Sequence, residues 1–544
     1  MNSQCCAVKV LRPTQATLFG WSHSGSPEPI SQSSLSSNLA NLDQPFFLLQ
    51  KDDGYFSAND GQASQQSENS FQVIGLCPEL SPFDLGDPAF KATYGTKYAL
   101  YGGSMANGIS SEDMVIALGN GGLMGSFGAG GCLPTRIEKA IHRIQNELNG
   151  KPYLFNLINS PFEPALEART AELYIKHGIR AIEASAYVAL TSNLVWYRLA
   201  GLSRLPDGSI QINHRIIAKV SRKEVAQKFL APAEQSIVNQ LLAEGKITDE
   251  QARLSQYVPM ADDITVEADS GGHTDNRPLV SILPAILQLR DSIQDQYQFP
   301  QPTRIGAAGG IATPASALAA FMMGAAYITT GSINQGCVES GASEHSKNLL
   351  SQMEMTDVAM APASDMFEMG VKVQVLKRGT MFAMRAQKLY EIYQRYESVE
   401  EIPTPEREKL ESTILRQSMD SVWNECVKFF GERDPKQIER ANQKPKDKMA
   451  LIFRWYLGLS SRWSNSGEKG REMDYQIWCG PAMGAFNDWV KGTYLEKPEN
   501  RSVTDVSMHI LRGAAFLWRL RMLEAQGLRF ADEICKYTPA DRLM

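Results

Sequence analysis

Three features are missing from this sequence, and each absence excludes a class of protein. It has no C-x-x-C pair, no run rich in Lys and Arg, and no apolar stretch long enough for a membrane helix. The eight cysteines are scattered, which fits neither a zinc framework nor a disulfide scaffold, so we expect reduced thiols. A formal net charge of −6 disfavours nucleic acid and anionic membranes as partners.

Membrane insertion and secretion are also disfavoured. The longest apolar run, ALAAFMMGAAYI at 317–328, is too short to span a bilayer and contains a glycine. The first residues, MNSQCCAVKVLRPTQ, lack the apolar core of a signal peptide. We therefore expect a soluble, cytoplasmic protein without a membrane span.

The 544 residues suffice for two to four domains, or for one large barrel with additions. Residues 22–70 are rich in Ser, Gln, Asn, Gly and Asp and poor in apolar residues. This composition predicts a poorly ordered linker or a loosely packed surface segment. We therefore expect residues 1–94 to form a partly irregular N-terminal segment.

From about residue 95, short apolar strands alternate with helical patterns, which is typical of parallel βα units. Helices are predicted between them, for example over 134–150 and 163–178. Eight strands predict an α/β protein with a (β/α)8 TIM barrel over 95–380, a helical insertion at about 225–260, and a helical region over 381–544. The strands are expected at 99–105, 123–129, 153–158, 181–185, 216–220, 264–269, 304–310 and 327–332.

In such a barrel, function collects at the C-terminal ends of the strands, where the βα loops meet. Several strands here end on glycine or on polar residues, as in ITVEADSGGH at 264–273. These ends supply the candidate site residues, which are Gly103, Ser104, Met105, Asn156, Lys219, Asp269, Gly271, Gly272, His273, Gly309, Gly310, Gly331 and Ser332.

The ends of strands seven and eight indicate a phosphate site. Gly309-Gly310 precede a helix, and Gly331-Ser332 follow the last strand. Glycines let backbone N–H groups approach phosphate oxygens, and barrels frequently hold a phosphate at this position. The simpler interpretation is two tight turns that need glycine. The Gly-rich stretch GNGGLMGSFGAGG at 119–131 does not match G-x-G-x-x-G and follows a helix, so we reject a Rossmann site.

Asn156 and Lys219 end apolar strands, where an unsatisfied polar group is costly. A flavin would explain both residues, although a pairing of Lys219 with Glu183 is an alternative. His273 follows two glycines at the mouth of the barrel, which is the end where the βα loops meet. We interpret it as the candidate acid, and the alternative interpretation is an ordinary solvated histidine in a loop. Asp269 or Asp275 could orient its imidazole.

Several segments resemble one family, over roughly residues 75–530. They include GGSMANGIS, FNLINSPFEPALE, AIEASAYVALT, ITVEADSGGHTDNRPL, GAAGGIATPASALAAFMMGAAYITTGSINQ and DYQIWCGPAMGAFNDWVKGTYLE. They resemble the trans-acting enoyl reductases of microbial polyunsaturated fatty-acid and related polyketide synthases. The barrel of this family is similar to that of nitronate monooxygenases and of FMN-dependent enoyl-acyl-carrier-protein reductases.

The resemblance implies a mechanism. FMN would lie across the barrel mouth with its phosphate on Gly309-Gly310 and Gly331-Ser332, and Met105, Asn156 and Lys219 would border the ring. NAD(P)H would reduce the flavin, which would pass hydride to the β-carbon of a 2-enoyl thioester carried on an acyl carrier protein. His273, beside Gly271 and Gly272, would protonate the α-carbon. An FMN-dependent nitronate oxygenase and a non-catalytic docking protein are the rivals, and a homo-oligomer is left open.

Overall fold

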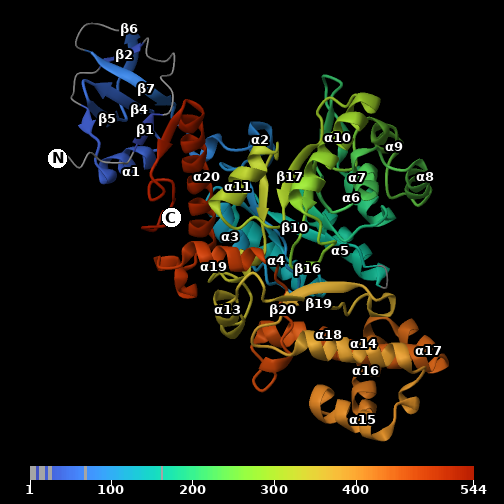
Figure 1. The fold of residues 1–544 in the computed structure, drawn as a ribbon. Helices are drawn as coiled ribbons and strands as arrows, with labels where there is room; N and C mark the ends of the chain where they lie inside the picture. Colours follow the sequence, from blue (N-terminus) through green and yellow to red (C-terminus); the bar gives the residue numbers. More distant parts are fainter. Residues whose placement is uncertain (1–7, 11–18, 23–26, 66–69, 161–162) are drawn as a thin grey trace.

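The computed structural model of this chain describes residues 8–10, 19–22, 27–65, 70–160 and 163–544. Its centre is a closed parallel barrel whose strands follow chain order and close between β18 and β8 (Figure 1). The eight predicted strands are all present, and the predicted fold class is confirmed. They are β8 (Leu100–Gly102), β9 (Met124–Phe127), β10 (Leu154–Ile158), β11 (Ala181–Ser185), β14 (Arg215–Val220), β15 (Asp263–Glu267), β17 (Arg304–Ala308) and β18 (Ile328–Thr330).

Amphipathic helices cover the outside of this barrel. In α4, for example, Ile137, Ile141, Ile144 and Leu148 recur at helical spacing and are buried, and the helix ends at Asn149 in the left-handed conformation. The seven helices that follow the first seven strands are α3 (Glu112–Asn120), α4 (Pro134–Leu148), α5 (Pro164–Lys176), α6 (Ser192–Ala200), α7 (Lys223–Leu230), α10 (Leu279–Tyr297) and α11 (Pro314–Met322).

The eighth helix of the barrel comes from the far end of the chain. α20 (Val503–Ala525) packs against both α11 and α3, in the gap that the helix after β18 would fill. Gly513 permits this approach, because a Cβ there would lie 2.4 Å from Cγ of Pro314. Only short helices, α12 (Ser332–Gln335) and α13 (Glu344–Ser351), directly follow β18 in the described chain.

Smaller elements decorate the barrel. The predicted insertion contains α8 (Gln235–Ala243) and α9 (Asp249–Leu254), whereas α7, which begins at Lys223, occupies the barrel position after the fifth strand. A hairpin of β12 (Leu202–Arg204) and β13 (Ile210–Ile212) follows α6, and α2 (Pro88–Tyr94) precedes the first strand of the barrel.

The N-terminal segment forms a sheet, so the predicted linker or loosely packed segment at 22–70 is wrong. The sheet order is β3-β5-β4-β7-β2-β6, and α1 (Gln32–Ala40) lies beside it. In the central strand, Phe46 and Leu48 pack into the main core, while Phe47 and Leu49 pack into a small cluster on the other face. The few apolar residues are thus concentrated in the strands that need them, which an average over the window conceals. The strands are β2 (Phe19–Ser22), β3 (Glu28–Pro29), β4 (Phe46–Lys51), β5 (Gly54–Ala58), β6 (Gln62–Gln65) and β7 (Phe71–Cys77).

Between β18 and α20 the chain leaves the barrel and returns. A hairpin of β19 (Val358–Pro362) and β20 (Lys372–Leu376) leads into a helical lobe, which lies below the barrel in Figure 1 and is followed by α19 (Ala482–Val490). The lobe leaves and rejoins at one place, since Met381 N–H donates to the Met473 carbonyl at 2.8 Å. Its helices are α14 (Phe382–Arg395), α15 (Thr404–Leu410), α16 (Met419–Arg433), α17 (Pro435–Gln443) and α18 (Pro445–Ser466).

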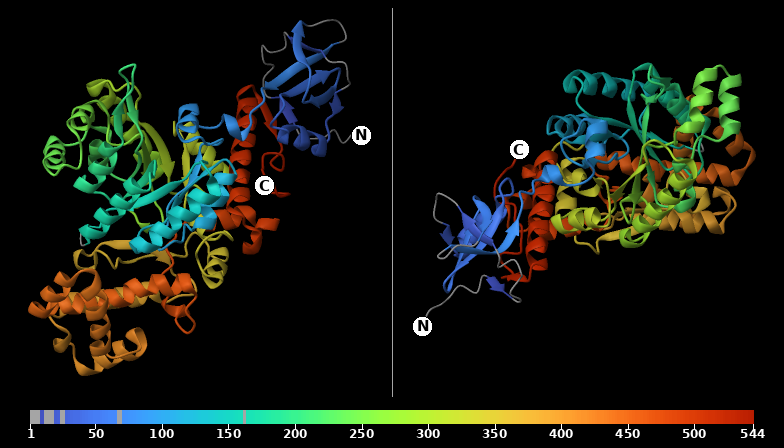
Figure 2. Two further views of the ribbon diagram at one scale, coloured as in Figure 1. Left: turned by 180° about the vertical axis from the view of Figure 1, so that it is seen from behind. Right: turned by 90° about the horizontal axis from the view of Figure 1, so that it is seen from above.

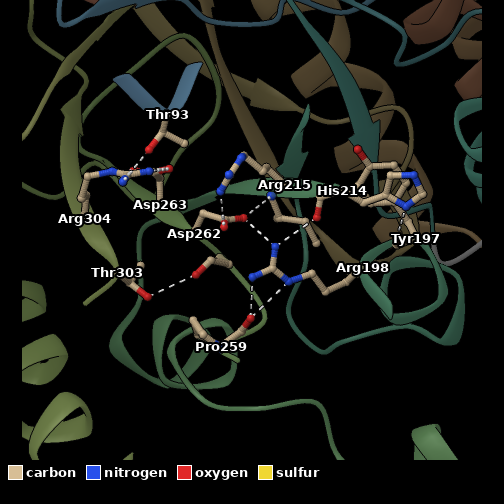
Figure 3. Close-up of polar contacts among 12 residues, drawn as sticks. Thr93, Tyr197, Arg198, His214, Arg215, Pro259, Asp262, Asp263, Thr303 and Arg304 are labelled. Carbon is tan, nitrogen blue, oxygen red and sulfur yellow. Dashed lines mark hydrogen bonds and ion pairs between the residues drawn. The ribbon is translucent and has the colours of Figure 1, made fainter. Parts of the chain in front are cut away.

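Buried ion pairs hold the N-terminal ends of the strands, opposite the mouth (Figure 3). Arg304 clamps Asp263 through two hydrogen bonds of 2.6 and 2.7 Å. The neighbouring Asp262 accepts from Arg198 at 2.6 Å and from Arg215 at 3.2 Å. Burial raises the pKa of the Asp262 carboxyl, but the charges of the two arginines lower it more, so its pKa lies below the ordinary value. These pairs fix neighbouring strands to one another by charge.

Two further expectations concern absences. No helix in the described part of the chain combines the length and the apolar composition that a bilayer crossing requires. The described cysteines are free, and Cys5 and Cys6 lie outside the described residues.

Because α20 completes the layer of helices around the barrel, we predict that a chain truncated after residue 380 does not fold. It loses the buried apolar face of α20, and each buried Leu, Ile or Val contributes about 1.5–3 kcal/mol against a total stability of about 5–15 kcal/mol. Replacing residues 382–474 by a short Gly-Ser linker should instead leave a barrel that unfolds cooperatively. Circular dichroism during urea titration measures both variants. A cooperative transition in the truncated chain would contradict the closing role of α20.

Candidate active site

The loop after β15 leaves the barrel and pairs with a strand from beyond it. Within this loop, β16 (Gly272–His273) is antiparallel to β20, with His273 opposite Val373 and Gly272 opposite Gln374. The polar end of ITVEADSGGH is therefore held at the mouth by the β19–β20 hairpin. This sheet contact fixes the backbone that carries the candidate acid.

His273 has a carboxylate partner that the sequence did not indicate. Its Nε2 lies 3.1 Å from Oδ1 of Asp365, which follows β19. Partial burial lowers the pKa of the His273 imidazole, and the charge of Lys219 lowers it slightly. The hydrogen bond and charge of Asp365, with the charge of Glu267, raise it more, so the net pKa lies above the ordinary 6.5. The His273 side chain is 40% exposed, so a substrate can reach it.

The prediction that Asp269 or Asp275 orients His273 is therefore wrong, because both carboxylates are used to hold the loop. Asp269 Oδ1 accepts from Asn276 Nδ2 and from Gln374 Nε2, each at 2.8 Å. Asp275 accepts two hydrogen bonds from Arg222, at 2.9 and 2.7 Å. The hydrogen bond from Arg222 is the main cause that lowers the pKa of Asp275 to about 2.

Lys219 lies among carboxylates, as the alternative interpretation expected. Its Nζ is 3.1 Å from Glu267 Oε1 and 3.5 Å from Glu183 Oε1. Burial lowers the pKa of Lys219, but the charges of the two carboxylates raise it more, so it remains an ammonium. Glu183 also accepts from Ser104, through its N–H at 3.0 Å and its Oγ at 2.9 Å. A fixed positive charge therefore sits at the ends of β11, β14 and β15.

The other predicted ring neighbours are Asn156 in β10, which pairs with β11, and Met105 in the loop after β8. Asn156 is buried in the middle of β10, and its Nδ2 donates to Ser185 Oγ at 2.9 Å. Gly103 N–H donates to the Thr330 carbonyl at 2.9 Å, which joins the first and last strands at the mouth. A Cβ on Gly128 would lie 1.7 Å from the Met105 carbonyl, so the Gly-rich stretch serves close packing.

The glycines after β17 and β18 fit a phosphate group. Gly309 and Gly310 have φ of 82° and 74°, a conformation that other residues rarely adopt. A Cβ on Gly310 or Gly331 would meet no atom within 4 Å, so space is open beside this backbone. Among the described residues, the N–H groups of Gly310 and Gly331 have no hydrogen-bond acceptor. Open space beside free backbone donors is what an anion requires.

The segment before α19 completes the mouth. Gly480 N–H donates to Ser332 Oγ at 3.0 Å, and a Cβ on Gly271 would lie 2.6 Å from Cα of Cys479. The loops after β15 and β18 therefore both contact residues 479–480. The sequence reasoning missed Asp365, Gln374 and Gly480, because each lies 92 or more residues from its partner at the mouth.

Two family models match the chain. The nitronate monooxygenase model matches residues 88–400, which is more than half of the chain, and the inserted helical domain of [acyl-carrier-protein] S-malonyltransferase matches residues 396–475. The second match coincides with the helical lobe between β18 and α20.

Named relatives point to the same group. The chain is 46% identical over 507 residues to a polyunsaturated fatty acid synthase subunit of Thraustochytrium sp., covering 92% of this chain and 34% of that protein. It is 46% identical over 439 residues to polyketide biosynthesis protein PksE of Bacillus subtilis, covering 80% and 57%. It thus spans only about a third to a half of these relatives.

A solved structure agrees more completely. The enoyl reductase domain of MlnA, from the macrolactin biosynthesis cluster of Bacillus amyloliquefaciens, is 42% identical with a TM-score of 0.77. The match covers 81% of this chain and 99% of that domain. The chain therefore belongs to the nitronate monooxygenase family, in the branch that includes the MlnA enoyl reductase domain and these polyunsaturated fatty-acid and polyketide synthase proteins.

Proposed function

We propose that this protein is an FMN- and NAD(P)H-dependent enoyl reductase. Its substrates would be 2-enoyl thioesters on the acyl carrier protein of a polyunsaturated fatty-acid or polyketide synthase, reached in trans. The observation that carries this proposal is the 42% identity to the MlnA enoyl reductase domain over nearly the whole of that domain. The acid, ammonium and free backbone donors at the mouth are the groups that this chemistry needs.

Each group at the mouth has a role in this proposal. Gly309, Gly310 and Gly331 would hold the FMN phosphate through backbone N–H groups, while Asn156 and Lys219 would border the ring together with Gly103, Ser104 and Met105. When bound, FMN supplies hydride for the β-carbon of the enoyl thioester. Asp269 keeps the loop with Gly271 and Gly272 in place through Gln374.

His273 would then act as the acid. With Nε2 donating to Asp365, the other proton of the imidazolium lies on Nδ1, which can hydrogen-bond the enolate-like thioester and protonate its α-carbon. A pKa above the ordinary value keeps this proton available near neutral pH. In this proposal Asp365 is a positioning residue, because it acts through its hydrogen bond to the imidazole.

The helical lobe supports this arrangement from outside the barrel. Arg454 of α18 donates to the Ser364 carbonyl at 2.8 Å, directly before Asp365, and to Glu368 at 3.0 Å. Asn107 of the loop after β8 donates to Ser461 of the same helix at 3.2 Å. The lobe therefore lies at the rim of the mouth, where we propose that the acyl carrier protein docks.

Nitronate oxidation is the second candidate, because the family model that matches the barrel carries that name. The two activities differ in their need for oxygen. A reductase oxidises NAD(P)H with a 2-enoyl thioester under anaerobic conditions, whereas an oxygenase consumes O₂ when it oxidises a nitroalkane under air. We expect turnover of the thioester only. Turnover of the nitroalkane under air, with an inert thioester, would overturn the reductase proposal.

We predict that Gly310→Val lowers the FMN content of the purified protein strongly, because its side chain would occupy the open space beside the free N–H groups. Gly150→Val is the matched control. Gly150 also has a positive φ, of 87°, and open space around its Cβ position, so the backbone strain is similar, but it lies in the turn after α4. Absorbance at the flavin band per chain measures both. If the folded Gly310→Val protein still carried one FMN per chain, the phosphate would have to bind at another site.

We predict that His273→Ala slows reoxidation of the NAD(P)H-reduced protein by an enoyl thioester by roughly 10²–10⁴-fold, while reduction by NAD(P)H changes little. Asp365→Asn removes the charge that raises the pKa of His273. Because the acid form is lost as pH rises through that pKa, the alkaline limb of the rate should move to lower pH. Stopped-flow absorbance from acid to mildly alkaline pH measures both variants. An alkaline limb unmoved in Asp365→Asn would show that Asp365 does not act on the imidazole.

A further inference from the structure

One stripe of α4, on the outer layer of the barrel, faces the C-terminal end of α5. Glu138, His142 and Gln145 lie at helical spacing of four and three residues, which places them on one face. Gln145 Nε2 donates to the carbonyl of His177, the residue that caps α5, at 2.9 Å. The backbone of His177 is therefore fixed relative to the other two residues.

Three side chains of metal-ligand type converge there. His177 Nε2 lies 2.8 Å from Glu138 Oε1, and the rings of His142 and His177 stand perpendicular with centroids 5.0 Å apart. One ligand atom from each of the three residues lies within 4.8 Å of the others, and within the described residues no other group of His, Cys, Asp or Glu meets this test. The His177 side chain is only 13% exposed, whereas Glu138 is 34% exposed and His142 is open to solvent.

We propose that Glu138, His142 and His177 form a binding site for a divalent transition-metal ion of the zinc class. Two imidazole nitrogens and one carboxylate oxygen are the protein donors of three-ligand zinc sites, in which water fills the remaining position. The C-terminal end of α5 adds the partial negative charge of the helix dipole. Bound there, the ion would join α4 to α5.

Lys176 is the competitor that the proposal must include. Its Nζ lies 3.1 Å from Glu138 Oε1 and supplies a positive charge where the metal would bind. The Lys176 side chain is 63% exposed, so its ammonium can move into solvent when the metal arrives, at the cost of the ion pair with Glu138. Small rotations of the exposed His142 and Glu138 side chains would then bring the donors to bonding distance.

The experiment is a titration of the chelator-treated, untagged full-length protein with Zn²⁺ by calorimetry, and with Co²⁺ by visible absorbance. We expect one ion per chain. His142→Ala should weaken binding by more than the roughly 10–100-fold that loss of an outer-shell partner costs, and the variant should fold because solvent surrounds this side chain. His345→Ala is the control, because His345 packs edge-on against Tyr475 and belongs to no such group among the described residues.

Lys176→Ala gives the sharper test, since it removes a charge and no ligand. The Lys176→Ala protein should bind Zn²⁺ more tightly than the wild type. If Lys176 did not compete with the metal, its removal would leave the affinity for Zn²⁺ unchanged. The proposal is overturned if the wild-type protein takes up no ion at a large molar excess of Zn²⁺, if His142→Ala binds as tightly as the wild type, or if Lys176→Ala binds no more tightly than the wild type.

Discussion

The packing of α20 as the eighth helix around the barrel is the constraint on which the rest of the architecture depends. The first seven helices are local to their strands, but the eighth begins at Val503, far along the chain from the end of β18 at Thr330. Everything between them must therefore leave the barrel and return. α20 also binds the N-terminal unit, because Arg519 donates to the carbonyls of Leu39 and Gln44 at 3.1 and 2.7 Å. Figure 2 shows this helix between the N-terminal sheet and the barrel. One helix thus holds the N-terminal unit to the barrel.

Because the chain leaves the barrel and returns, segments from outside the barrel take part in the candidate site at its mouth. A barrel by itself presents strand ends and short loops, and here these supply the glycine backbone donors, Lys219 and His273. The carboxylate that holds His273, and the Gln374 amide that holds its loop, come from the hairpin after the barrel. Helix α18 in turn holds the segment that carries Asp365. The orientation of the candidate acid therefore depends on the helical lobe.

The sequence predicts the barrel well and its partners poorly, for one physical reason. Strand and helix patterns repeat over short stretches of chain, so ITVEAD and PTRIEKAIHRIQNEL are recognisable by themselves. The interaction of His273 with Asp365 spans 92 residues, and nothing local in either segment indicates the other. Asp269 and Asp275 are the natural candidates because they are near in sequence, yet they hold the loop. The N-terminal sheet escapes prediction for a related reason, because its buried apolar residues come from short strands that are separated in sequence, such as the FFLL run of β4, Trp21 of β2 and Val73 of β7.

Two strands near opposite ends of the described chain pair with each other. β1 (Val8–Val10) is antiparallel to β21 (Leu528–Phe530), with Val8 opposite Phe530. A polypeptide that contains such a unit enters and leaves it at neighbouring points, so the unit occupies almost none of the end-to-end span of a larger chain. This geometry suits relatives such as the Thraustochytrium protein, in which the matching segment is 34% of the whole. Gaining or losing the unit would therefore leave the spacing of flanking domains nearly unchanged.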